Sequence, residues 1–599
     1  MRRKKLLRQV AAAAVALSMA VSLSAPAFAA TFDLSNGGLV ITANDSGITV
    51  KRDDGTSSTY SIDEEIEIKG TYSSANGATQ TAEENRQEEN QPVTPAKAPA
   101  KEETSEETPE AEDTPAAEKK QEQKDTEAPA DPEQNTETEN KDNNSDPDNE
   151  EKKEQNAPAN GELNASAGEG QESKAEDEGQ PKLKTEAKAS AEASASASDD
   201  TSDNASNGPH KAPARSGGEG ERTSIIQIIN NTAKKIKVSL SNAHIDLPTA
   251  ADTSARGQAA IDVQGGDVEL KFSGKNTLTG SGGSAGIQKN DKTQDGKENT
   301  GTLTITADNK SDTLDVKVDE FSLGQDNQGA AIGGGGRKTD GKYGGYGTKN
   351  IVIEGNGTVN TNAQIGSGFR GGAATGIVIQ GNAVVNVGDG GIGGIGLPEW
   401  YGTEKPGETD VTITGNANVT VKNGTIGSGV RRGEVCGNAK IEISENAVVN
   451  VEGGDNAAAI GSGAGGDANV TITGNAKVTA VQKSDWYGGG AGIGSGSSDT
   501  KDDSKKGAVT INITDGTIEK AEGKNGGAGI GSGYYGRSST VNISGNAELK
   551  DVRGGNLAAG IGSGYDSDKV DVVIDGGTIN ATGGDSAAGI GSGLNSRSS

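Results

Sequence analysis

A short motif, A-x-I-G-[SG]-G, recurs nine times after residue 330 and constrains the fold more than any other feature. Its isoleucines are Ile332, Ile365, Ile395, Ile426, Ile460, Ile493, Ile530, Ile561 and Ile590. The copies at Ile365, Ile395 and Ile426 depart from the consensus at one or two positions. The nine copies cover 258 residues in eight intervals, or about 32 residues each. A period this regular predicts repeated, stacked structural units.

A second motif lies between these copies and consists of an alternating strand, a tight turn and another strand. Examples are VTITGNANVTV at 411–421 and VTITGNAKVTA at 470–480. Valine and isoleucine project to one face and threonine to the other, as a half-buried strand requires. The last isoleucine before the turn keeps step with the first motif, at Ile353, Ile379, Ile413, Ile443, Ile472, Ile513, Ile543 and Ile574.

Each repeat therefore holds three short strand candidates, separated by Gly, Asn and Asp turns. Three strands in about 32 residues suit one coil of a parallel β-helix, with coils stacked at about 4.8 Å and nine copies covering roughly 40 Å. Glycine in AGIGSG fits a sharp corner or a positive φ. The main rival fold is a β-propeller, whose blades need about 40 or more residues and four strands.

The chain divides into four parts. Residues 1–30 combine a basic start, an apolar run and the A-F-A pattern of a cleavage site, which predicts a signal peptide and a secreted or cell-surface protein. Residues 31–75 are strand-like, 76–222 are acidic, and 223–599 contain the repeats. No later segment reaches the ~20 apolar residues of a membrane span. The single cysteine, Cys436, excludes an intrachain disulfide.

The acidic part, residues 76–222, carries 38 acidic and 16 basic side chains. From residue 81 on, its only large aliphatic residues are Val93, Leu163 and Leu183. Such a stretch cannot offset an ordering cost of roughly 1–2 kcal/mol per residue, so we expect it to be disordered. The interpretations are a solvated, self-repelling linker or a spacer that binds cations or basic cell-wall groups. The overall charge of −30 argues against nucleic acid as a partner.

The strands of 31–75 are too few to fold alone, so we expect them to cap the N-terminal end of the repeats. The acidic stretch is then an insertion within one domain. The chain stops at GSGLNSRSS in mid-repeat, from which we expect a fragment of a longer protein.

The order of segments suggests a family. DLSNGGLVIT, VSLSNAHIDL, AAIDVQGGDVELKFSGKNTLTG, AGIQ and GTLTITA precede the serial AGIGSG copies. This order resembles secreted carbohydrate-binding β-helix proteins of Gram-positive bacteria, over most of the chain outside the acidic stretch. The resemblance implies a right-handed parallel β-helix that binds plant polysaccharides such as cellulose or acidic pectin without cleaving them, with bound calcium as an option. The long acidic insertion departs from the family's pattern.

Aromatic side chains are few and fall in loops. Exposed aromatic rings stack on the apolar faces of sugars, and arginine side chains pair with uronate carboxylates. The loop aromatics and the arginines near them are therefore candidates for a carbohydrate site. The candidates are Trp400, Tyr401, Trp486, Tyr487, Tyr534, Tyr535, Arg431 and Arg432, followed by Phe369 and Tyr565, which also come after GSG. On a solenoid, those that follow the repeat motif lie along one edge. The alternative is that they cover the apolar edges of the coils.

Four Asx residues, Asp455, Asn525, Asn556 and Asp585, each lie five residues before a motif isoleucine. We expect them to stack at one turn, where such side chains stabilise the backbone. Calcium needs six to eight oxygens at one point, and these acids are dispersed. A calcium site therefore has no assigned location.

No catalytic constellation stands out. The two histidines are His210, in the acidic stretch, and His244, in an early strand, and Cys436 has no base near it in sequence. A lyase or glycosidase needs acids gathered in one cleft; dispersed Asp and Glu leave that third option open. The two main hypotheses are a non-catalytic polysaccharide-binding protein and a structural stalk or adhesin whose β-helix displays other parts to protein partners. Cell-wall components and other surface proteins are the further candidate partners.

Overall fold

The computed structural model describes residues 30–73, 224–247, 257–293, 295–319, 328–336, 345–369, 371–395, 408–429, 436–454, 456–483, 488–498 and 507–597. The predicted signal peptide, apart from its last residue, and the whole acidic stretch lie outside these residues. One compact unit comprises residues 1–92 and 217–599, and it contains every described residue; the other unit is 93–216.

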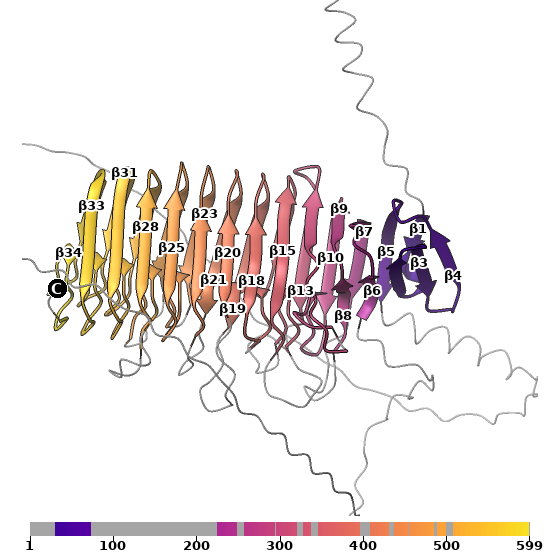
Figure 1. Cartoon of the computed structure of the whole chain (residues 1–599), viewed down its shortest axis with the longest axis horizontal. Coiled ribbons are helices and arrows are strands. Elements are labelled where there is room, and N and C mark those ends of the chain that lie inside the picture. The colour runs from indigo at the N-terminus through magenta and orange to yellow at the C-terminus, as the bar shows by residue number, and fades with distance from the viewer. Residues whose placement is uncertain are drawn as a thin grey trace, which may run out of the picture. The chain divides into compact units, whose positions relative to one another are not determined.

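The described residues form an all-β solenoid whose strands stack in three parallel ladders (Figure 1). The pre-turn ladder holds β1 (Ala30–Asp33), β5 (Glu65–Ser73), β7 (Ile236–Asp246), β9 (Val268–Ser273), β12 (Leu303–Ala307), β15 (Thr348–Gly355), β18 (Ala374–Ile379), β20 (Thr409–Ile413), β22 (Ala439–Ile443), β25 (Ala468–Thr473), β28 (Val509–Thr514), β31 (Ser539–Arg553) and β33 (Val570–Thr582). This ladder comes first in each coil.

The other two ladders complete the coil. The post-turn ladder joins the later halves of β5, β7, β31 and β33 to β10 (Lys275–Gly280), β13 (Thr313–Val318), β16 (Thr358–Thr361), β19 (Val384–Ile395), β21 (Asn418–Gly429), β23 (Val448–Gly453), β26 (Lys477–Gln482) and β29 (Thr517–Glu522). The IG ladder joins the ends of β19 and β21 to β2 (Leu39–Asn44), β6 (Ser224–Asn230), β8 (Ala259–Gly265), β11 (Ile287–Gln288), β14 (Ile332–Gly333), β17 (Ile365–Gly366), β24 (Ile460–Gly461), β27 (Ile493–Gly494), β30 (Ile530–Gly531), β32 (Ile561–Gly562) and β34 (Ile590–Gly591). The predicted parallel β-helix is confirmed.

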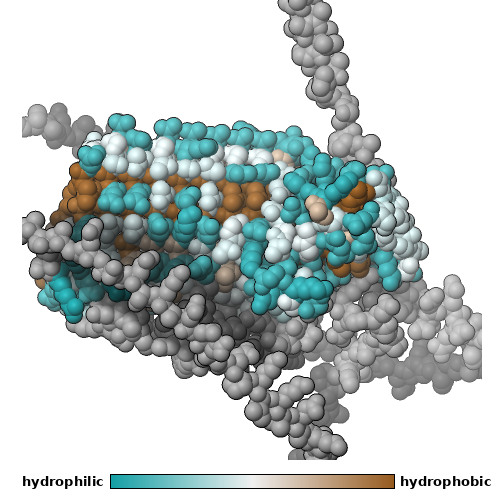
Figure 2. Space-filling view, in the orientation of Figure 1, coloured by the Kyte–Doolittle hydropathy of each residue, from teal (hydrophilic) through white to brown (hydrophobic). Residues whose placement is uncertain are grey.

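The pairing register confirms the predicted isoleucine ladder. Ile413 pairs with Ile443, Ile443 with Ile472, and Ile472 with Ile513, each in parallel register. These side chains are fully buried, whereas the polar residues directly before them are partly exposed, namely Thr412, Glu442, Thr471 and Asn512. Because every coil carries the same kind of residue at the same position, apolar and polar residues form rows along the stack (Figure 2).

One predicted register is wrong. Ile392, and not Ile395, pairs with Ile365 on one side and Ile426 on the other. Ile395 pairs with Gly429 instead. The segment GGIGGIG offers two similar steps three residues apart, and the neighbouring coils select the first because β19 is already held in register by Val385.

The glycine of each IG strand is required by the stacking. Gly494 has a φ of 141°, and a Cβ on this residue would overlap the carbonyl oxygen of Gly531 in the next coil. Side chains larger than hydrogen are excluded by both the backbone angle and the close approach. The predicted positive φ of this glycine is confirmed, and the glycine lies within the IG strand.

The N-terminal strands belong to the same sheet system. β2 pairs in parallel with β6, and β5 pairs in parallel with β7, across the acidic stretch. β2 also forms an antiparallel meander with β3 (Gly47–Arg52) and β4 (Ser57–Tyr60). Chain order places β5 and β6 in successive strand positions, so residues 74–223 separate two strands of one coil. The one helix of the described part, η1 (Leu34–Asn36), has three residues, and no described helix could span a membrane.

Candidate functional site

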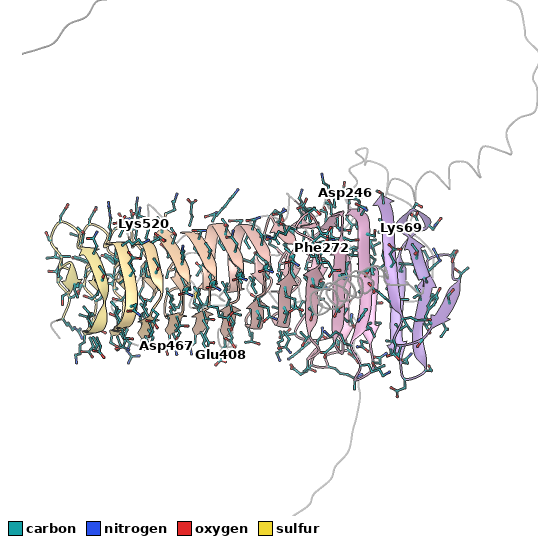
Figure 3. All side chains as sticks on the ribbon, turned by 90° about the horizontal axis from the view of Figure 1, so that it is seen from above. Lys69, Asp246, Phe272, Glu408, Asp467 and Lys520 are labelled. Carbon is teal, nitrogen blue, oxygen red and sulfur yellow. The ribbon has the colours of Figure 1, made fainter. Side chains whose placement is uncertain are left out.

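A cluster of three tyrosines lies at the corner between the IG strands and the pre-turn strands that follow them. Tyr534 and Tyr565 each come four residues after an IG isoleucine, and Tyr535 N donates a hydrogen bond of 3.0 Å to Tyr565 O. We call Tyr534, Tyr535 and Tyr565 the tyrosine edge. Glu408 and Asp467, which directly precede β20 and β25, mark the same corner on earlier coils and lie along one long edge in Figure 3.

The three rings are in mutual contact. The ring centroids of Tyr534 and Tyr565 are 5.1 Å apart with planes 19° from parallel, which is a stacked pair. Tyr535 is tilted at 56° to Tyr534, with centroids 4.2 Å apart. The coil repeat produces this arrangement because it brings the same position of two neighbouring coils into van der Waals reach.

All three tyrosines are half-buried. Gly526 makes room for them: a Cβ there would collide with the Tyr534 ring and come within 3.0 Å of the Tyr565 Cβ. Burial, and then a hydrogen bond with Tyr535, raises the pKa of the Tyr534 hydroxyl above its ordinary value. The hydroxyl of Tyr565 accepts a hydrogen bond of 3.0 Å from Asn595 Nδ2. The edge therefore presents three partly accessible rings and a Tyr534 hydroxyl whose ionisation is disfavoured.

Next to this edge lie two buried oxygens that have no hydrogen-bond partner among the described residues. They are Ser497 Oγ and Asn456 Oδ1, and the Ser497 amide donates to the Asn456 carbonyl at 2.9 Å. A Cβ on Gly488 would be 3.2 Å from Ser497 Oγ and 3.7 Å from the Tyr534 ring, so Gly488 lies between the serine and the tyrosine edge. An unmet buried polar atom costs about 1–3 kcal/mol, which favours binding of a water molecule or a ligand hydroxyl here.

The other predicted site residues are distributed differently. Trp400, Tyr401, Arg431, Arg432, Trp486 and Tyr487 all lie outside the described residues. Gly488 directly follows the Trp486-Tyr487 pair in the sequence. Phe369 is only 2% exposed, so the interpretation of Phe369 as a sugar-stacking residue is wrong.

The predicted stacking of the Asx residues before the IG motif is supported at Asn525, whose turn lies directly against the turn that carries Asn556 in the next coil. Asn525 has a φ of 49°, and its carbonyl accepts from Leu557 N at 3.4 Å, which is a backbone turn role. Asp455 lies outside the described residues. In the described part of the chain, no three His, Cys, Asp or Glu side chains gather as metal ligands, and a calcium site stays without a location.

The first coils contain a buried polar cluster that was not predicted from the sequence. Asp262 is paired with Gln288 in the IG ladder, where later coils have glycine, and its carboxylate accepts from Gln288 Nε2 at 3.3 Å and Gln264 Nε2 at 2.6 Å. Lys289 is fully buried, and its Nζ donates to the Asn299 carbonyl at 3.0 Å. The sequence signal for this cluster is the segment AGIQKN at 285–290, which departs from the repeat motif AGIGSG.

Burial favours the uncharged form of both Asp262 and Lys289. It raises the pKa of Asp262, although hydrogen bonds from Gln264 and Gln288 act in the opposite direction. It lowers the pKa of Lys289 from 10.5 to about 8, against the attraction of Asp267 and Asp291. The cluster is enclosed, so we assign it to the stability of the first coils and not to ligand binding.

Comparison with protein-family models found no match, and neither a search of curated proteins nor a search of solved structures found one. The resemblance to secreted carbohydrate-binding β-helix proteins therefore stays a prediction.

Proposed function

We propose that this protein is a secreted or cell-surface polysaccharide-binding protein that does not cleave its ligand. The observation that supports this most is the tyrosine edge: three half-buried rings from neighbouring coils, in mutual contact, on the outside of a rigid solenoid. Aromatic rings held this way stack on the apolar faces of sugars at low entropic cost, because the scaffold fixes their positions beforehand.

The surroundings of the tyrosine edge suit a polyhydroxylated ligand. The unmet oxygens of Ser497 and Asn456 can accept hydrogen bonds, and the Tyr534 hydroxyl is a neutral donor. Arg537, two residues after Tyr535, is exposed and could pair with the carboxylate of an acidic polysaccharide. The proposed ligands are accordingly plant-type or acidic polysaccharides, with cell-wall components or other surface proteins as further partners.

The proposed location outside the cell rests on the first thirty residues, whose basic start, apolar run and small-residue pattern are typical of export signals. A secreted solenoid that presents aromatic side chains along one edge suits the capture of polymers. The competing hypothesis is a stalk that displays other parts of the chain and binds no glycan.

Affinity electrophoresis in gels that contain polygalacturonate, xyloglucan or hydroxyethylcellulose tests the proposal. The protein used is the chain without its predicted signal peptide, residues 31–599, which we call the full mature chain. Tyr565→Ala removes one ring of the stacked pair and is expected to weaken binding about tenfold, in line with the ~1–3 kcal/mol that stacking of one ring contributes at other planar ligands. Tyr565→Phe keeps the ring and loses only the hydroxyl that Asn595 contacts, so it should bind nearly as wild type does.

The thermal midpoint of both variants separates a binding role from a purely structural one. If Tyr565→Ala lowers the midpoint but leaves the retardation by every polysaccharide unchanged, the tyrosines only cover the coil edge and the proposal for this edge is wrong. Absence of retardation of the wild-type chain would favour the stalk.

A further inference from the structure

An open trough runs along the solenoid at the turn between the pre-turn and post-turn strands. Five successive coils contribute one polar side chain each to its lining: Thr306, Glu354, Gln380, Thr414 and Glu445. The volume of the trough is about 490 Å³. The trough is separate from the tyrosine edge, which lies after the IG strands.

The floor of the trough has no side chains because glycine occupies the turn position of three coils. Gly355, Gly381 and Gly415 line it, with φ angles of 88°, 71° and 74°. The next coil has Glu445 at the same position with a φ of 58°. A side chain here both closes the trough and demonstrates that the turn accepts a residue other than glycine.

A row of asparagine amides begins one residue beyond the floor glycines. Nδ2 of Asn382 donates to Asn356 Oδ1 at 2.9 Å, Asn416 donates to Asn382 at 2.9 Å, and Asn446 donates to Asn416 at 3.0 Å. Each amide of the exposed residues Asn382 and Asn416 uses one N–H and one lone pair in this ladder. The second N–H and the second lone pair remain for a ligand.

The polar lining is likewise ordered before any ligand binds. Gln380 Nε2 donates to Glu354 Oε2 at 2.6 Å, and Ser444 Oγ donates to Thr414 Oγ1 at 2.9 Å. Fixed donors and acceptors reduce the entropy that binding must remove. The trough therefore offers a rigid row of hydrogen-bonding groups with one set per coil.

The repeat length of this row fits a polymer of sugars. Coils are spaced by about 4.8 Å, so the five lining positions cover roughly 19 Å. In an extended glycan with equatorial linkages, each ring advances by nearly the same length. Two lining residues are carboxylates, Glu354 and Glu445, and no lining residue is basic. A polyuronate would be repelled by these carboxylates, whereas a neutral chain would not.

We propose that the trough binds an extended neutral polysaccharide chain along the solenoid axis, with one sugar ring per coil. This inference rests on the proposed polysaccharide-binding function and gives it a second surface and a ligand class. The lining contains no aromatic residue. Binding therefore depends on many weak hydrogen bonds, and long chains should bind better than short ones through multivalency.

The blocking variant is Gly381→Asn, in the full mature chain, with hydroxyethylcellulose in the gel as the probe. A Cβ at Gly381 would be 3.3 Å from its nearest neighbour, Gly355 N, and asparagine tolerates a positive φ. The control is Gly372→Asn, which has a φ of 83° and open space around its Cβ, and which lies outside the trough between β17 and β18. Gly381→Asn should bind hydroxyethylcellulose about tenfold more weakly, because a blocked ring loses its hydrogen bonds and those of its neighbour.

Weaker binding by Gly381→Asn could also come from misfolding, so a second variant, Glu445→Gly, is chosen because it should bind more tightly. It removes a side chain at a positive φ and opens the trough toward Gly474, so it should bind the probe about threefold more tightly, as one more ring would add roughly one hydrogen bond. Unchanged or weaker binding by this variant would count against the trough.

The outcomes separate the two proposals. If hydroxyethylcellulose retards Gly381→Asn and wild type equally, the trough is not the site, while polysaccharide binding at the tyrosine edge stands. Retardation of wild type by polygalacturonate alone would also overturn the neutral-chain proposal and keep the broader one. If none of the polysaccharides retards the wild-type chain, the proposed function itself is wrong.

Discussion

Lys289 should make the stability of the first coils depend on pH in the alkaline range. Its side chain is fully buried, and its Nζ has a hydrogen bond of 3.0 Å to the Asn299 carbonyl. Asp262, Asp267 and Asp291 attract the ammonium group, but the cost of burial is larger and lowers the pKa of Lys289 from 10.5 to about 8. The perturbation that tests this reasoning is Lys289→Met, which keeps an unbranched side chain one atom shorter and removes the charge.

The sign follows from proton binding. Between pH 8 and 10.5 the unfolded chain holds a proton on this lysine that the folded chain has lost, so the free energy of unfolding rises as pH rises. At about 1.36 kcal/mol per pKa unit, the change across this window is about 3 kcal/mol. The stability is lost again as pH falls from 10.5 to 8, and below pH 8 the buried ammonium lowers stability by that constant amount.

Urea unfolding followed by far-UV circular dichroism at pH 7.5, 8.5, 9.5 and 10.5 measures the effect. The difference in unfolding free energy between wild type and Lys289→Met should move by about 3 kcal/mol in favour of wild type as pH rises. Lys477→Met, at an exposed position, controls for the loss of one positive charge. Parallel pH profiles of wild type and Lys289→Met would refute the assignment of a buried, destabilised ammonium.

Three further predictions concern the solenoid itself. Ile472→Ala empties a fully buried rung of the isoleucine ladder and should destabilise the protein by about 2–5 kcal/mol in urea unfolding; a loss below 1 kcal/mol would contradict the tight packing. Gly494→Ala should cost at least about 1–3 kcal/mol, because an added Cβ overlaps the Gly531 carbonyl, and a thermal midpoint equal to that of wild type would contradict this. After limited proteolysis within residues 81–222, the fragment 31–75 should co-elute with the repeats in size exclusion, because β2 and β5 pair with β6 and β7; its release under native conditions would oppose that expectation.

The coil architecture could be predicted from sequence because it is a property of spacing. A repeat of about 32 residues with alternating Val, Ile and Thr places Ile413, Ile443 and Ile472 in one ladder without any knowledge of tertiary contacts. The register of Ile392 could not be predicted in this way. Two equivalent IG steps follow each other there, and only pairing with the coils on both sides chooses between them.

The candidate sites were less predictable than the fold. The buried state of Phe369 and Lys289 depends on how neighbouring coils cover them, and the sequence pattern of loops suggested exposure for Phe369. The trough is a property of five coils together, and no single turn motif indicates it. The side-chain amide ladder at the GNA turn, where Asn382 and Asn416 stack in register, was not predicted, because a single Asn in a turn motif does not show that its neighbour in the next coil is also Asn.

Polysaccharide binding by the full mature chain is the central claim, and a quantitative binding isotherm tests it most directly. Retardation should be measured against increasing concentrations of xyloglucan, hydroxyethylcellulose and polygalacturonate, with a non-binding protein of similar charge as the reference. We predict saturable retardation by at least one of these polymers, weakened about tenfold by Tyr565→Ala or Gly381→Asn according to the surface used. Mobility equal to that of the reference protein at every concentration of all three polymers would contradict the account.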